Sequence, residues 1–128
     1  MKESRVQTKI KKEIEKLGGK VINGVYTATG EADLQCGYPV NGVLLYLAIE
    51  VKTPKMYEKM MQSIYIKNNR YEIKDYDYLK DHEILQLAKL NDVRDRGGLA
   101  ILADSWERVE EYIKEATLPV AIVTMDVT

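Results

Sequence analysis

Three charged residues stand in a stretch that otherwise has the pattern of buried strands, and together they could do chemistry. The stretch "GEADLQCGYPVNGVLLYLAIEVKTPK" begins at Gly30 and contains Asp33, Glu50 and Lys52. Side chains alternate between the two faces of a strand, so Glu50 and Lys52 share one face. The turn signal "YPVNG" predicts two antiparallel strands, and this hairpin places Asp33 beside Glu50.

Two neighbouring carboxylates repel each other, and this repulsion indicates what the pair could hold. Burying both is costly unless a cation lies between them. A divalent cation removes that cost and makes a water molecule acidic enough to attack phosphorus. Lys52 lies one strand step from Glu50 and could hold or polarise such a water. The alternative is a solvated face of an edge strand, where charges are common. Spacing alone does not decide between the two.

The composition narrows the kind of cation and the cellular setting. The chain has 128 residues with one cysteine, Cys36, and one histidine, so neither a disulfide nor an imidazole-rich metal site is available. Oxygen ligands remain, and they favour Mg²⁺ or Mn²⁺. No apolar run could cross a bilayer or act as a signal segment, so a cytosolic protein without membrane contact is predicted. The net charge of −1 excludes binding of nucleic acid through bulk charge but leaves a local basic surface open.

The order of the predicted elements indicates one mixed α/β domain over residues 1–128. Apolar spacing and end signals predict helices over 3–17 and 83–96, and a third that Asp104 caps with Glu107 in a capping box. Strands are predicted over 21–27, 31–37, 43–53 and 99–103, with a further C-terminal strand in "LPVAIVTMDV". The resulting order is αβββαβα plus that extra strand, a mixed central sheet flanked by helices.

A segment rich in tyrosine and lysine, at about residues 56–81, interrupts this order without a clean period. A helix is predicted around 57–64, and the rest is either extended or a flap. Cationic and aromatic side chains can follow phosphates and stack on exposed bases, so the segment could contact DNA. Interleaved acids dilute the charge, and a dimer arm or a solvated loop is the alternative.

Several motifs together resemble one family. "GEAD", a hairpin and "LAIEVKTPK" resemble the core of the PD-(D/E)XK nuclease superfamily, and more narrowly the VRR-Nuc family, the virus-type replication-repair nucleases. "ESRVQTKIKKEIEKLGGKV" resembles that family's first helix, and "ILQLAKLNDVRDRGGLAILADSWERVEEYI" its closing helix, strand and helix. The resemblance covers most of the chain apart from about 56–81 and the C-terminal tail. It implies a restriction-endonuclease-like fold. Ala32 departs from the proline that usually precedes the aspartate.

The resemblance implies a set of metal ligands in this chain. Asp33 and Glu50 would be the metal-binding carboxylates, with the backbone carbonyl of Val51 as a further ligand. Glu3 would complete the acidic site, either directly or through water. The helical spacing of Glu3 also supports this, because it shares the inward stripe of Val6. The alternative is an ordinary acid at a helix N-terminus.

Two further catalytic roles follow from the same resemblance. Lys52 would position the attacking water or steady the phosphate, and Gln86 would be the polar helix residue beside it. Gln86 falls on the apolar face of Leu90 and Val93, where an amide needs a partner. A satisfied core amide is the alternative.

The implied activity is that of an endonuclease that hydrolyses DNA phosphodiester bonds with Mg²⁺, for which Mn²⁺ would substitute. Single-domain members of the family look like Holliday-junction resolvases, so branched DNA and a homodimer are expected, from a prokaryote or a virus. Three alternatives remain open. They are a nicking or restriction-like nuclease on ordinary duplex, a DNA-binding module without catalysis, and a plain α/β domain in which Asp33 and Glu50 point apart.

Overall fold

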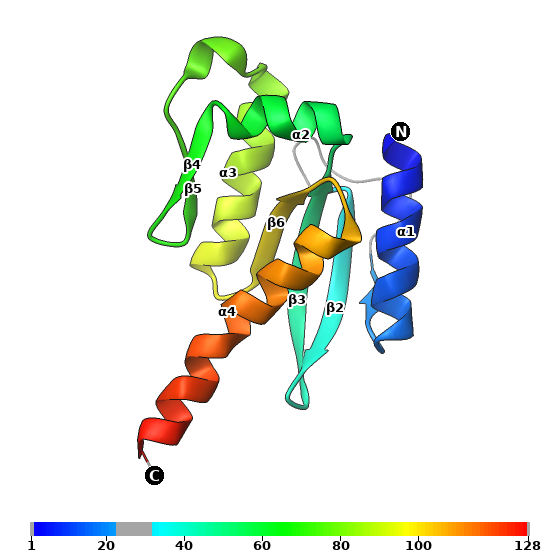
Figure 1. The fold of residues 1–128 in the computed structure, drawn as a ribbon, viewed down its shortest axis with the longest axis vertical. Helices are drawn as coiled ribbons and strands as arrows, with labels where there is room; N and C mark the ends of the chain where they lie inside the picture. The colour runs from blue at the N-terminus through cyan, green and yellow to red at the C-terminus, as the bar shows by residue number, and fades with distance from the viewer. Residues whose placement is uncertain (1, 23–31, 128) are drawn as a thin grey trace.

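A four-stranded sheet lies between two layers of helices (Figure 1). The computed structural model describes residues 2–22 and 32–127, with side chains through residue 117. The strand order is β1-β2-β3-β6, in which β1, β2 and β3 are antiparallel and β6 runs parallel to β3. These strands are β1 (Lys20–Val21), β2 (Leu34–Val40), β3 (Val43–Val51) and β6 (Leu99–Ala103).

The two faces of the sheet have separate apolar cores. Helices α1 (Glu3–Lys16) and α4 (Trp106–Val127) cover one face, and α3 (Asp81–Asp95) covers the other (Figure 1). Alternation along β3 sends Ile49 toward α1 and α4, and Ala48 toward α3. The mixed α/β arrangement predicted from the sequence is therefore confirmed. The C-terminal end of β3, which carries Glu50, lies between the two helical layers.

The predicted tight turn is present and fixes the register of the central hairpin. Asn41 and Gly42 have φ values of 50° and 79°, the left-handed pair that a two-residue hairpin needs. Strand β2 begins at Leu34 and reaches Val40, instead of spanning 31–37, because pairing continues up to the turn. Asp33 thus lies one residue before the strand. Residue 31 and the predicted first strand beyond residue 22 lie outside the described residues.

The Tyr/Lys-rich segment forms ordered elements that pack on α3. They are α2 (Pro54–Met61), a hairpin of β4 (Ile64–Lys67) and β5 (Arg70–Ile73), and the 3₁₀ helix η1 (Tyr76–Tyr78). Helix α2 begins earlier than predicted because Thr53 caps it, accepting the amide of Met56 at 3.3 Å. Asn91 of α3 anchors the hairpin through two hydrogen bonds with the backbone of Tyr71, at 2.7 and 2.9 Å.

Along the outer edge of β6, where a further strand could pair, side chains form hydrogen bonds with the backbone. The amide of Leu102 donates to the hydroxyl of Tyr71 at 2.9 Å, and that of Ala100 to the hydroxyl of Tyr112 at 3.0 Å. Nε of Arg94 donates to the carbonyl oxygen of Ala100 at 2.7 Å. Edge strands with free polar groups invite pairing with other chains, so this arrangement protects the edge.

Tyr71→Phe is therefore expected to lower the free energy of unfolding by about 1–3 kcal/mol, because it leaves the buried Leu102 amide without an acceptor. Urea unfolding measures this difference. Tyr76→Phe serves as the control, since Tyr76 is exposed in η1. Equal stability of the two variants would mean that the edge bond contributes nothing.

Helix α4 differs from the prediction at both ends. The "LPVAIVTMDV" segment continues the helix through Val127 and does not form a strand, an ambiguity that short apolar runs always carry. At the start, the Ser105 hydroxyl accepts the amide of Arg108 at 3.3 Å, while Asp104 binds the Arg108 side chain at 2.6 Å. The predicted capping box of Asp104 and Glu107 is wrong. Among the described residues, none of the helices has the length and apolar character needed to cross a membrane.

Candidate active site

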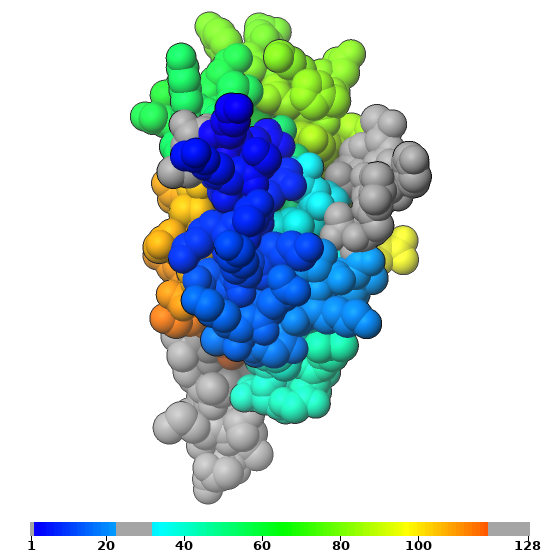
Figure 2. Space-filling view, turned by 90° about the vertical axis from the view of Figure 1, so that its right-hand side faces the viewer, coloured from blue at the N-terminus to red at the C-terminus, as the bar shows by residue number. Residues whose placement is uncertain are grey.

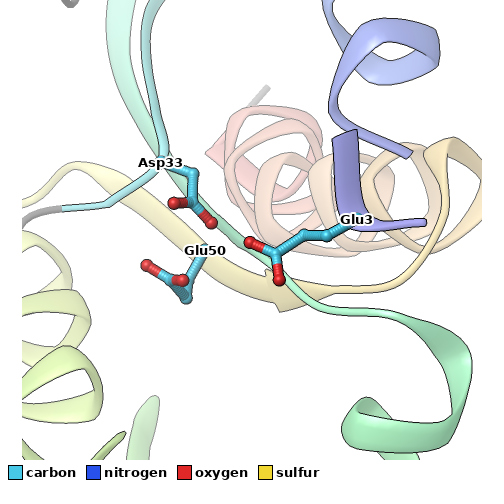
Figure 3. Close-up of side chains that lie close together, drawn as sticks. All are labelled: Glu3, Asp33 and Glu50. Carbon is cyan, nitrogen blue, oxygen red and sulfur yellow. The ribbon is translucent and has the colours of Figure 1, made fainter. Parts of the chain in front are cut away.

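Three carboxylates from separate elements converge at the end of β3 (Figure 3). Glu3 comes from the first turn of α1, Asp33 from the residue before β2, and Glu50 from β3. One oxygen of each lies within 4.8 Å of the others. Glu50 is 2% exposed and the other two are partly buried. The arrangement brings together the acidic residues that the sequence singled out, and Asp33 and Glu50 do not point apart.

The hairpin and one backbone bond hold Asp33 in place. Leu34 pairs with Ile49, so Asp33 lies level with Glu50. Its Oδ2 accepts the backbone amide of Val51 at 2.9 Å. Because the N–H and C=O of a strand residue point to the same side, the Val51 carbonyl is expected to face Asp33 as well.

A glutamine on α3 links the buried glutamate to the lysine. Nε2 of Gln86 donates to Oε2 of Glu50 at 3.1 Å, and its Oε1 accepts Nζ of Lys52 at 3.0 Å. Nζ of Lys52 is also 3.6 Å from Oε2 of Glu50. The Lys52 amide donates to the Ala103 carbonyl at 2.9 Å, which extends the β3–β6 pairing past β3. The five residues expected from the sequence to be catalytic therefore lie together in one group.

This group carries more negative charge than its surroundings stabilise. Burial raises the pKa of Glu50 to about 9, and Asp33 adds to this through a hydrogen bond and its charge. The two carboxyls can share that hydrogen bond only when a proton lies between them. Burial also raises the pKa of Glu3, to which the charge of Asp33 adds, while Lys52 and a hydrogen bond from Gln7 oppose the rise.

The donor set fits a hard divalent cation. Oε1 of Glu50 is buried and has no hydrogen-bond partner within the described part of the chain. A buried charged oxygen without a partner is costly, and a cation among the three carboxylates would remove that cost. Carboxylate oxygens are the ligands that Mg²⁺ and Mn²⁺ prefer.

The raised pKa of Glu50 makes the stability of the metal-free protein depend on pH. The folded state keeps a proton that the unfolded chain releases near pH 4.5, so this stabilisation is complete below that pH and is lost as the pH rises toward about 9. In EDTA, the free energy of unfolding should fall by up to about 1.4 kcal/mol per pH unit across this range. Urea unfolding at several pH values checks this, and a flat profile would contradict it.

Two contacts of the site were not predicted from the sequence, although Gln7 is the glutamine four residues after Glu3 in the motif that resembles the family's first helix. The backbone amide of Val51 orients Asp33, and the Gln7 side chain bonds Glu3. The Gln7 contact had a signal, since residues four apart share a helix face. The Val51 amide had none, because any strand residue has such a group.

One solved structure, described as a "VRR_NUC domain", is similar to this chain. The two are 26% identical, and the match covers 88% of this chain and 94% of that chain with a TM-score of 0.53. No family model and no curated protein matches the sequence. The likeness thus spans most of both chains.

Proposed function

We propose that this chain, which belongs to the VRR-Nuc family and has its restriction-endonuclease-like fold, is a metal-dependent endonuclease that hydrolyses DNA phosphodiester bonds. The observation that carries the proposal is the convergence of Glu3, Asp33 and Glu50 beside Lys52. The match to a VRR_NUC domain supports the nuclease class. The acidic cluster and the unpartnered Glu50 oxygen support the use of a divalent cation.

The metal ligands in this proposal are Asp33, Glu50 and the Val51 carbonyl, with Glu3 binding directly or through water. Mg²⁺ is the proposed ion, and Mn²⁺ would substitute. When bound, the ion supplies positive charge that stabilises the negative charge building on the phosphate and makes a nearby water more acidic.

Lys52 has the role of steadying the phosphate or the attacking water. Its ammonium group has three donors, of which Gln86 takes one, and its side chain is held beside Glu50. Gln86 fixes the lysine and the glutamate relative to each other, because its amide bonds both. It is thus a positioning residue that keeps the ammonium aimed at the cluster.

Branched DNA is the proposed substrate and a homodimer the proposed assembly. A domain of 128 residues has little surface for holding a long duplex. A two-fold dimer would present two acidic sites to two strands, as cutting at a junction requires. Nicking or restriction-like cutting of ordinary duplex is the second candidate within the same class.

Cleavage of a labelled four-way junction and of a matched linear duplex tests the proposal. Wild type, Lys52→Ala and the surface control Lys55→Ala are compared with Mg²⁺, Mn²⁺ or EDTA. The proposal expects junction cutting that needs metal and Lys52 but not Lys55. Equal cutting of both substrates would remove the branch preference. A folded protein that binds DNA and never cuts it would be a binding module.

A further inference from the structure

The charge of the chain is distributed unevenly. Residues 2–20, which contain α1, hold seven lysines or arginines and three glutamates, a net charge of +4. The whole chain has a net charge of −1, so the remaining residues have −5. A protein of this kind can bind a polyanion only through a local basic surface. Helix α1 is one part of the chain where that surface can lie, and residues 52–70, with five lysines or arginines and one glutamate, are the other.

Most cations of α1, with Lys2 just before it, lie along one flank of the helix. Five of them follow each other at spacings of three, four, three and four residues, which places them on one face. We call these the basic stripe: Lys2, Arg5, Lys9, Lys12 and Lys16, all of them exposed. At 1.5 Å per residue the stripe is about 21 Å long. It starts at Lys2, one residue before Glu3 of the acidic cluster.

Two of the five residues of the stripe border a hollow on the outer surface of the molecule. Figure 2 shows α1, in blue, as the most prominent element of this face, with nothing packed over it. Arg5 and Lys9 line a cavity of about 660 Å³ together with Pro54 and Trp106. Pro54 begins α2 shortly after β3 ends, so this hollow lies toward the same end of β3 as the proposed cutting site. Lys11 lies on the opposite flank of the helix, in a different hollow that includes Asp33.

The stripe can exchange its present partners for a ligand. Lys9 and Lys16 bind Glu13 at 3.0 and 3.5 Å, but these are exposed ion pairs, which contribute little and break readily. Arg5 and Lys12 have no ion pair with any described residue. Across the hollow, α4 presents acids, with Arg108 already bound to Asp104. The cationic side of the hollow is therefore α1.

We propose that the basic stripe binds the DNA backbone beside the cut site, an inference that rests on the proposed function. Lysine and arginine contacts to phosphates set the register of a nucleic acid without reading its sequence. A stripe of about 21 Å matches about six nucleotides of one strand at 3.4 Å each. The stripe begins at Lys2, one residue before Glu3, so a backbone lying along it reaches the end of α1 that carries the acidic cluster.

Two triple variants with the same loss of charge test this. Lys9, Lys12 and Lys16 are changed to Gln in one, and Lys59, Lys67 and Lys74 of the Tyr/Lys-rich segment in the other. Junction binding is measured over a salt series in a Lys52→Ala background with Mg²⁺. Lys20→Gln, at an exposed lysine of β1 outside the stripe, controls for loss of charge alone, and thermal melting checks that each variant is folded.

The stripe triple should reduce the slope of log K against log salt by about 2–3, since each lost phosphate contact removes about 0.9. With Lys52 intact, it should raise KM at least about tenfold, as weaker backbone binding requires, while kcat stays nearly constant. The segment triple and Lys20→Gln should have much smaller effects on both.

Each other outcome has a distinct meaning. If the stripe triple binds DNA as wild type does, or if both triples lose the same affinity, DNA binding by the stripe is ruled out. Cleavage by wild type would still support the nuclease proposal. A loss of self-association without any loss of DNA affinity also overturns it, because the stripe would then bind an acidic second copy. Stripe-dependent DNA binding without cutting in any metal keeps the stripe and overturns the nuclease. A chain that neither binds nor cuts DNA overturns both.

Discussion

Glu50→Gln is expected to reduce DNA cleavage by a factor of about 10³ or more, because a metal site that loses its buried charged ligand forfeits several kcal/mol of transition-state stabilisation. Glutamine keeps the size of the side chain and can still contact Gln86, so the fold should survive. What it lacks is the charge that a divalent cation needs at Oε1, the oxygen without a hydrogen-bond partner among the described residues.

The same substitution should have the opposite effect on stability. In the wild type Glu50 is buried and its pKa is raised to about 9. Burying its ionised form destabilises the folded state more as the pH rises. Glutamine has no such cost, so in EDTA at about pH 8.5 the variant should be more stable than wild type by about 1–3 kcal/mol. Mg²⁺ should raise the melting temperature of wild type and not of the variant.

Glu58→Gln is the matched control, since Glu58 is exposed on α2 and outside the cluster. It should leave cleavage, the response to Mg²⁺ and the pH profile close to wild type. A Glu50→Gln enzyme that keeps more than about a tenth of the wild-type rate would contradict the account, because the lost ligand would then be worth less than about 1.4 kcal/mol.

Lys52→Ala should lower the cleavage rate by about 10²–10⁴, the usual contribution of a positioned group that handles a proton or a developing charge. Cation binding should persist, because all three carboxylates remain. Lys52→Arg should not restore the rate: the planar guanidinium cannot replace a compact ammonium held between Gln86 and Glu50.

Single-turnover kinetics with saturating metal separates these two substitutions. Lys52→Ala should show a slow chemical step with a normal metal titration, whereas Glu50→Gln should fail in the titration itself. Lys55→Ala controls for charge near the site, since Lys55 is exposed at the start of α2. A metal titration lost equally in both catalytic variants would mean that Lys52 supports the fold of the cluster and not the chemistry.

The acidic pair was predictable because two local rules determine it. Side chains alternate along a strand, and Asn41-Gly42 allows only a tight hairpin. Together these place Asp33 level with Glu50 whatever the rest of the chain does. Glu3 and Gln86 were named with the help of a family resemblance, because helical spacing shows which face a residue occupies but not which distant strand it reaches.

The segment after β3 was not predictable in the same way. Its hairpin is held by bonds between residues far apart in sequence, such as Asn91 with the backbone of Tyr71. No periodic pattern in the local sequence predicts contacts between residues so far apart. The prediction of a C-terminal strand was wrong for a different reason, because a short apolar stretch is compatible with both a strand and a buried helix.

The most direct test of the central claim is a crystal of the wild type soaked in Mn²⁺, with anomalous scattering recorded to locate the ion. The account predicts a strong peak bonded to Asp33 and Glu50 and close to Glu3, and no peak there in Glu50→Gln. A fully soaked crystal in which the three carboxylates are ordered and no ion lies among them would contradict it.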